Sequence, residues 1–290
     1  MKLTKDTNIL IVGLGVIGGG YAAKLTSLGY KVRCITKEQS DVDYALKNKM
    51  IISGTTEIDK DLIYSADLIV FALYPTIFID WIKENQHLFR SGTLITDVTG
   101  VKKSVVKVVQ SILRDDVEFI PHHPMAGRER SGVEYADYKV FEGANFIVTP
   151  TEKNTKEAIE LVKELGATLG FAKISELSVD EHDDMIAFLS QLTHCIAVTL
   201  MTCNSEPNLE KYTGDSFRDL TRIAKINDQM WSELFAMNKD SLLAQMDAFS
   251  REFSDFREFV ASGNTEKMRE KMRYATIRRT SFDKPVAKSN

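Results

Sequence analysis

Two adjacent histidines, His122 and His123, begin a segment rich in small residues that follows a predicted strand. The segment reads HHPMAGRERSG over residues 122–132. Because histidine titrates near neutral pH, a neutral imidazole held here can accept a proton from a substrate hydroxyl. The segment therefore predicts a general base, with His123 as the candidate. Taken alone, the segment is better explained as a histidine-containing turn between a strand and a helix, and only the other segments favour a chemical role.

The N-terminus carries a second chemical signal, the run NILIVGLGVIGG at residues 8–19. It predicts a strand that leads through GxGxxG into a helix. Gly13 permits the tight turn, Gly15 lets the backbone approach a pyrophosphate, and Gly18 allows the helix to pack closely on the strand. We therefore predict a bound dinucleotide. The predicted cofactor contacts are Gly13, Leu14, Gly15, Val16, Ile17, Gly18, Thr36, Lys37, Leu73 and Asp97.

The end of the second predicted strand, Lys31–Ile35, distinguishes the two nicotinamide cofactors. NAD enzymes usually present Asp or Glu there to the ribose 2′-hydroxyl. This chain has Thr36 and Lys37 instead. A hydroxyl and a cation suit a 2′-phosphate, so the prediction is NADP. NAD is the alternative if Glu38 or Asp41 binds the ribose.

Two further segments hold groups suited to a doubly anionic substrate. Residues 97–102 follow a predicted strand at the edge where open α/β sheets bind ligands. Residues 182–194 carry two histidines, His182 and His194. Each histidine, taken singly, is also explained as a hydrogen-bonded core residue.

Two arginines, Arg218 and Arg222, lie four residues apart in an apolar setting. Arginine in such a setting commonly pairs with a carboxylate, from the protein or from a ligand. They are therefore candidates for binding substrate carboxylates. The alternative is a salt bridge within the chain to Asp219, Asp228 or Glu233.

The elements that position these groups follow an α/β order in the first half of the chain. Short apolar runs alternate with helical patterns, which is typical of a parallel sheet covered on both faces. The predicted strands are Asn8–Val12, Lys31–Ile35, Asp67–Ala72, Thr93–Val98, Glu118–Pro121 and Asn145–Val148. A helix at about 154–167 and a strand at Phe171–Ser175 complete a predicted doubly wound, Rossmann-type domain over residues 1–177.

From about residue 178 the apolar periodicity is helical, which predicts an all-helical domain over residues 178–290. One seam, on a helix expected to be buried on nearly all sides, comprises Met185, Leu189, Leu192, Ile196, Thr199 and Cys203. A second comprises Leu242, Met246, Phe249, Phe253, Phe256 and Val260. The second seam has a wide apolar face that an intertwined homodimer would cover. An ordinary helical core is the alternative for either seam.

Composition restricts the partners and the compartment. The chain has 290 residues, a net charge of −4 and a pI near 5.8, which give no indication of nucleic acid or an anionic membrane as a partner. No run of eighteen apolar residues occurs, so we expect no membrane span. The three cysteines form no CxxC pair, and so predict neither a disulfide framework nor a metal site. We expect a cytoplasmic protein.

Together these segments resemble the prephenate/arogenate dehydrogenase family over nearly the whole chain. The matching runs are GLGxIGG at 13–19, DVxxVK at 97–102, HPMAGxExSG at 123–132, FxGxxFIVTP at 141–150, HDxxxAxxSxLxH at 182–194 and FRDLTRIAKINDQMW at 217–231. The resemblance implies NAD(P)-dependent oxidative decarboxylation of prephenate or arogenate in tyrosine biosynthesis. It also implies a helical dimerisation domain.

The resemblance further implies roles for single residues. His123 would be the catalytic histidine that hydrogen-bonds the ring hydroxyl, and Arg222 would bind a substrate carboxylate. His194 would be a second active-site histidine, Glu129 a gating carboxylate and Trp231 part of the pocket wall. The remaining implied substrate contacts are Gly127, Gln191 and Arg218.

Two departures from the family pattern concern this site. The family commonly has serine where this chain has Gly100, and Thr99 is the expected substitute. The family helix commonly reads SHLPH, whereas residues 190–194 read SQLTH. Gln191 therefore replaces a histidine and cannot become cationic.

Two other functions remain as alternatives. A β-hydroxyacid dehydrogenase of related architecture would carry a catalytic lysine on the interdomain helix, but residues 184–203 contain no lysine. A non-catalytic dinucleotide-sensing regulator would not require His123, His194 and Arg222 to converge.

Overall fold

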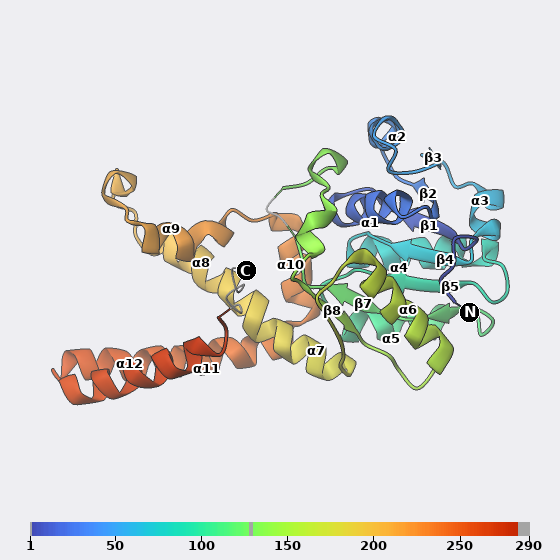
Figure 1. Cartoon of the computed structure of the whole chain (residues 1–290). Coiled ribbons are helices and arrows are strands. Elements are labelled where there is room, and N and C mark those ends of the chain that lie inside the picture. Colours follow the sequence, from blue (N-terminus) through green and yellow to red (C-terminus); the bar gives the residue numbers. More distant parts are fainter. Residues whose placement is uncertain (1, 128–129, 284–290) are drawn as a thin grey trace, which may run out of the picture. The chain divides into compact units, whose positions relative to one another are not determined.

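The computed structural model describes residues 2–127 and 130–283 (Figure 1). Its first sheet has six parallel strands in the order β3-β2-β1-β4-β5-β6. They are β1 (Asn8–Val12), β2 (Lys31–Ile35), β3 (Ser53–Thr55), β4 (Leu68–Phe71), β5 (Leu94–Asp97) and β6 (Glu118–Phe119). The predicted parallel sheet is confirmed, with β3 as an additional short edge strand.

Helices cover both faces of this sheet (Figure 1). One apolar core packs against α1 (Val16–Ser27), α2 (Gln39–Lys47) and α6 (Lys156–Leu169). The other packs against α3 (Lys60–Ser65), α4 (Pro75–Asn85) and α5 (Lys103–Ile112). Because both faces are buried, the strands have nearly continuous apolar sequences. The doubly wound, Rossmann-type class is therefore confirmed.

A second sheet consists of β7 (His122–Pro124), β8 (Asn145–Val148) and β9 (Lys173–Glu176). β8 pairs antiparallel with β7 and parallel with β9. The prediction that Asn145–Val148 joins the large parallel sheet was therefore wrong, because an apolar run predicts a strand but not its partner. As a consequence, His123 lies on a paired strand, opposite Ile147.

Every regular element described after residue 178 is a helix, as predicted. These are α7 (Val179–Ile186), a π-helical segment (Ala187–Leu192), α8 (Thr193–Thr202), α9 (Asp215–Thr221), α10 (Asp228–Met237), α11 (Lys239–Ala261), α12 (Thr265–Thr280) and short 3-10 turns. By packing, the chain forms two compact units, residues 1–241 and 242–290. The domain boundary predicted at residue 177 stays a prediction.

The helical run that carries the first apolar seam is only partly buried within the described part of the single chain. Phe188, Leu189 and Met201 are between 44% and 49% exposed. The expectation of burial on nearly all sides was therefore wrong for one chain, because periodicity does not tell which face a second chain covers. Among residues 2–127 and 130–283, the helical run 179–202 is long and apolar enough to cross a membrane, a test that core helices of soluble proteins also pass.

The second unit contains most of α11 together with α12. The two helices are joined by an ion pair between Lys271 and Glu252. Phe249 and Phe253 stack on α11 with ring centroids 6.1 Å apart, and their side chains are 40% and 64% exposed. The predicted apolar face is therefore present, and residues 2–127 and 130–283 of the single chain leave it exposed.

Candidate active site

The glycine loop between β1 and α1 has the geometry that its sequence predicts. Gly13 has φ +97°, a conformation that favours glycine, and a Cβ there would lie 2.5 Å from the carbonyl oxygen of Ala72. A Cβ on Gly18 would lie 2.0 Å from the carbonyl oxygen of Gly13. Leu73, which follows β4, also packs against the loop. Both glycines are thus required by the close contact of the loop with its neighbours.

The start of α1 is open to an anion. A Cβ on Gly15 would have no neighbour within 4 Å, so the loop backbone is accessible there. Gly15 is also the N-cap of α1, and no side chain caps the helix. The first-turn N–H groups, at Val16 and Ile17 among others, are therefore available to a phosphate. This arrangement fits the pyrophosphate of a dinucleotide.

The end of β2 holds the candidate groups for both nicotinamide cofactors. Thr36 is nearly buried, and its hydroxyl accepts a hydrogen bond from the backbone N–H of Leu14 at 3.4 Å. Lys37 extends into solvent, with Nζ 3.7 Å from the Glu38 carboxylate. Burial and neighbouring carboxylates raise the pKa of Asp41. The cation that would contact the 2′-phosphate of NADP, Lys37, therefore lies in the same short segment as Glu38 and Asp41, the acids that would contact the ribose of NAD.

Asp97 ends β5 and is completely buried. Its Oδ2 accepts hydrogen bonds from the N–H of Thr99 at 3.0 Å and from Nζ of Lys102 at 2.8 Å. Burial lowers the pKa of Lys102, and the charge of Asp97 opposes this shift. Within the described chain, Asp97 Oδ1 is a buried polar atom without a hydrogen-bond partner. It lies at the sheet edge where cofactors bind, which fits the predicted role of Asp97.

His123 is half-buried on β7. A Cβ on Gly100 would lie 3.9 Å from His123 Nε2 and 3.6 Å from Leu234, so these three residues border one small region. Burial lowers the pKa of His123 well below its usual value, and the neighbouring His182 and Lys102 side chains act in the same direction. The ring is therefore neutral at neutral pH, which is the form that a general base requires.

His122, the neighbouring residue, is fully buried and has a different environment. Its Nε2 lies 3.0 Å from the hydroxyl of Tyr21, and its Nδ1 lies 2.6 Å from that of Thr96. The Thr96 hydroxyl in turn donates to the carbonyl of Ile120. Both ring nitrogens of His122 are thus engaged within the fold, which leaves His123 as the candidate base.

Sequence reasoning missed the partner of His123. His123 Nδ1 lies 2.9 Å from His182 Nε2, and His182 Nδ1 lies 2.7 Å from Oδ1 of Asp183. Both partners belong to α7. The signal in the sequence was the His-Asp pair near the start of this helix, but its packing against β7 has no local signature.

His194 and Trp231 are brought together as predicted for one site. Their ring centroids lie 3.7 Å apart, with the rings inclined by 30°. The carbonyl of Ser190 accepts a hydrogen bond from His194 Nδ1 at 2.8 Å. Trp231 lies on α10, one turn before Leu234, which borders Gly100. α10 therefore connects this aromatic pair with the surroundings of His123.

The two arginines lie close in sequence but have different surroundings. The Arg218 guanidinium donates to Asp215 and to the carbonyl of Thr213, both at 2.9 Å. Its acidic partner is therefore none of the three considered from the sequence. Arg222 begins a 3-10 turn (Arg222–Ala224) that packs against α8, the helix of His194. The predicted substrate contacts of both arginines stay predictions.

Comparisons with known proteins agree with this architecture. A family model described as "Prephenate dehydrogenase, nucleotide-binding domain" matches residues 21–175. A second, described as "Prephenate dehydrogenase, dimerization domain", matches residues 178–274. This chain belongs to the prephenate dehydrogenase family.

Similar proteins cover most of the chain. It is 32% identical over 277 residues to prephenate dehydrogenase of Bacillus subtilis, an alignment that covers 92% of this chain and 74% of the relative. It is 26% identical over 272 residues to cyclohexadienyl dehydrogenase of Zymomonas mobilis, covering 90% of each. The crystal structure of prephenate dehydrogenase from Aquifex aeolicus with hydroxyphenyl propionate and NAD+ superposes with a TM-score of 0.89. It is 29% identical and covers 98% of this chain and 100% of that one.

Gly100, the first departure from the family pattern, borders His123 Nε2. The family commonly has serine at this position. The Thr99 hydroxyl instead hydrogen-bonds to the Asp97 carboxylate and lies 2.9 Å from the carbonyl oxygen of Val101. The substitution of Thr99 for the family serine stays a prediction, and these contacts count against it.

The second departure, Gln191, is 1% exposed. Its Nε2 donates to the carbonyl of Leu234 at 3.0 Å, and its Oε1 accepts from Asn238 at 2.8 Å. Gln191 therefore ties the π-helical segment to α10. A contact between Gln191 and the substrate stays a prediction. The two hydrogen bonds count against it, because they occupy both ends of the side-chain amide. Of the other predicted contacts, Gly127 is exposed, and Glu129 lies outside the described residues.

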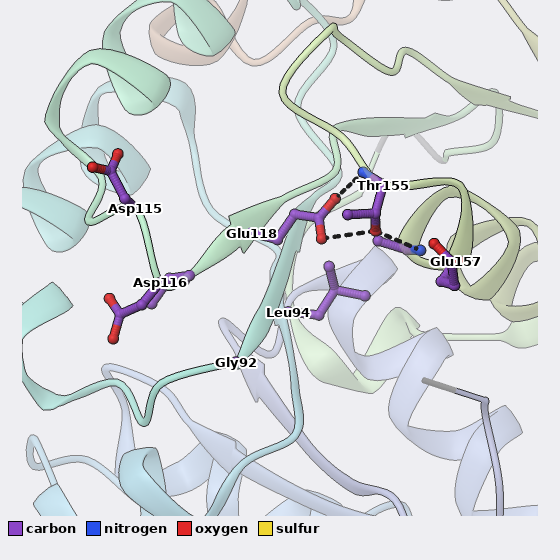
Figure 2. Close-up of a pocket in the computed structure, with 9 residues that line it drawn as sticks. Gly92, Leu94, Asp115, Asp116, Glu118, Thr155 and Glu157 are labelled. Carbon is purple, nitrogen blue, oxygen red and sulfur yellow. Dashed lines mark hydrogen bonds between the residues drawn. The ribbon is translucent and has the colours of Figure 1, made fainter.

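A surface cavity of about 270 Å³ lies elsewhere, between β6 and α6 (Figure 2). Its lining includes Asp115, Asp116, Glu118 and Glu157. The Glu118 carboxylate accepts hydrogen bonds from the N–H and hydroxyl of Thr155, the N-cap of α6. None of the predicted site residues lines this cavity, and Glu118 is accounted for by its contacts with the helix start.

Proposed function

We propose that this chain catalyses the NAD(P)-dependent oxidative decarboxylation of prephenate or arogenate in the cytoplasm. The observation that carries the proposal is the neutral His123, whose Nε2 borders Gly100 and Leu234 at the cofactor-binding edge. Family membership and the names of the relatives support the reaction class. In this proposal residues 1–177 bind the cofactor, and residues 178–290 supply substrate contacts and the dimer interface.

A bound nicotinamide would supply the hydride acceptor. The glycine loop and the start of α1 would hold the pyrophosphate, and Asp97 would border the nicotinamide end. His123 Nε2 takes the proton of the ring hydroxyl as its carbon is oxidised. Loss of the ring carboxylate as CO₂ then aromatises the ring. Because aromatisation drives the reaction, the protein mainly positions groups and neutralises charge, with Arg222 binding a substrate carboxylate.

The proposed reaction is tested directly with the purified full chain. Prephenate and arogenate are each mixed with NAD and with NADP, and the absorbance of reduced nicotinamide is followed. We expect turnover with at least one combination. Cofactor binding without turnover in all four would contradict the proposal and favour the sensing regulator.

For the cofactor, we propose a preference for NADP over NAD, supported by Thr36 and Lys37. We expect a lower KM for NADP, and a shift towards NAD in Thr36→Asp because a carboxylate repels the 2′-phosphate. Steady-state kinetics with each cofactor measures both. A tenfold or greater preference of the native protein for NAD would contradict this prediction and point to Glu38 or Asp41 as the ribose ligand.

We also propose that the exposed phenylalanine face of α11 forms a homodimer interface, supported by the match to a dimerization-domain family. Light scattering at micromolar concentration should give twice the chain mass of 32.7 kDa. Phe253→Glu should shift the mass towards one chain, because the interface would bury a charge. Ser254→Glu, at an exposed neighbouring position, is the matched control. A native mass near that of one chain would contradict the proposal.

A further inference from the structure

His123 begins a chain of hydrogen bonds that ends at a carboxylate. It runs from His123 Nδ1 to His182 Nε2 over 2.9 Å, and from His182 Nδ1 to Asp183 Oδ1 over 2.7 Å. His182 and Asp183 are 0% and 1% exposed, so water does not compete for these contacts. The direction in which each hydrogen points therefore depends on the protein groups alone.

The carboxylate of Asp183 is held at the start of α5. Its Oδ1 accepts the backbone N–H of Lys102 at 2.8 Å, and its Oδ2 accepts that of Lys103 at 2.9 Å. A helix N-terminus favours negative charge, so this site suits the ionised form. An ionised carboxylate has no hydrogen to donate. The hydrogen between His182 and Asp183 must then be on His182 Nδ1.

The remaining hydrogens follow from the neutrality of both rings. Burial lowers the pKa of His182, as does Lys102, while Asp183 and Asp97 oppose the shift. A neutral ring carries one hydrogen, so His182 Nε2 accepts, and the hydrogen between the two histidines is on His123 Nδ1. His123 is also neutral, and its Nε2 is therefore the nitrogen with a free lone pair. That is the atom which borders Gly100.

We propose that His182 and Asp183 are positioning residues that hold His123 in the Nδ1–H tautomer, so that Nε2 serves as the proton acceptor. This inference rests on the proposed role of His123 as the base. In the step, the substrate O–H bond breaks and the Nε2–H bond forms. The positive charge on His123 is then stabilised through His182 by the negative charge of Asp183, as in other histidine–carboxylate arrangements.

The tautomer is measured without substrate. The imidazole nitrogens of the full chain, which has five histidines, are labelled with ¹⁵N and their NMR shifts recorded at pH 8. His123 and His182 are assigned from the signals lost in His123→Asn and His182→Gln. Both rings are expected in the Nδ1–H form. An Nε2–H form of His123 would overturn the inference, whether or not the chain turns over prephenate or arogenate.

Two variants separate positioning from packing. His182→Leu removes the acceptor for the His123 hydrogen, whereas His182→Gln keeps a carbonyl acceptor. We expect kcat to fall about 10- to 100-fold in the leucine variant, with little change in KM, and to be largely restored in the glutamine variant. Equal kcat values for wild type and the leucine variant would overturn the inference.

The matched control is Tyr21→Phe, which removes a comparable buried hydrogen bond from His122. It should leave the His123 signals and kcat unchanged; a loss of the Nδ1–H form of His123 here too would overturn a specific role for His182. If the leucine variant does not fold, the native NMR spectrum still decides the tautomer. Absence of turnover in the wild type would contradict the proposed function, while the spectrum would test the tautomer separately.

Discussion

Replacement of His123 by asparagine is expected to lower kcat by about 10²–10⁴, the usual range for removal of a general base. Asparagine has no basic nitrogen, but its amide can still hydrogen-bond to His182. The cofactor should bind with wild-type affinity, because the glycine loop and α1 are unchanged. Absorbance of reduced nicotinamide gives kcat, and a fluorescence titration gives the dissociation constant of the cofactor. Wild-type turnover in this variant would exclude His123 as the base.

The pH profile of the wild type provides a second measurement of the same group. A base must be unprotonated, so activity is lost when pH falls through its pKa. Burial and the neighbouring charges lower the pKa of His123 below its usual value. The logarithm of kcat/KM should therefore remain level down to about pH 6.5, where an ordinary histidine is half-protonated, and decline only below it.

His122→Asn is the matched control for the adjacent residue. His122 is fully buried between Tyr21 and Thr96, so the change removes the ring nitrogen that the buried Tyr21 hydroxyl contacts. That costs about 1–3 kcal/mol of stability. The variant should show a lower Tm, and the molecules that remain folded should turn over normally. Equal losses of kcat in His122→Asn and His123→Asn would show that both histidines affect activity by stabilising the structure, and that His123 is not the base.

The sequence was sufficient to predict the elements that depend only on the residue types within a short segment. The glycine loop is one, because a positive φ at Gly13 and close contact at Gly18 each demand glycine. β3 was not predicted, because Ser53–Thr55 has no apolar run. β7 was not predicted, because Pro124 disfavours a strand. The partner of β8 could not be read from an apolar run that suits either sheet.

The part of the site that could not be predicted depends on contacts between distant segments. His182 and Asp183 reach His123 and the start of α5 because α7 packs there. Gln191 accepts a hydrogen bond from Asn238, which follows α10. The residue types identified His182 and Gln191 as polar groups on a predicted helix, but did not show which of them face a ligand. Periodicity likewise predicted the apolar seams without indicating which chain covers them.

Arg222→Ala is expected to raise the KM for the cyclohexadienyl substrate by roughly one to several powers of ten, while affinity for NAD(P) changes little. The change removes a charge-assisted pair worth about 1.5–3 kcal/mol, and it leaves a substrate carboxylate without its partner. Arg222→Lys should recover only part of the loss, because an ammonium group cannot reproduce the planar, two-pronged contact of guanidinium. Steady-state kinetics and a cofactor titration measure both quantities.

The competing explanation is that Arg222 only bridges an acid within the chain. In that case Arg222→Ala would lower Tm and leave KM nearly unchanged, whereas a substrate ligand would raise KM with little change in Tm. Lys225→Ala, which removes an exposed cation three residues along the same segment, is the matched control and should alter neither quantity. A comparable rise of KM in the Lys225 variant would show that the loss of any positive charge near the site raises KM, without a specific contact from Arg222. The bidentate role therefore requires that Arg222→Ala raise KM, that Arg222→Lys restore it partly, and that Lys225→Ala leave it unchanged.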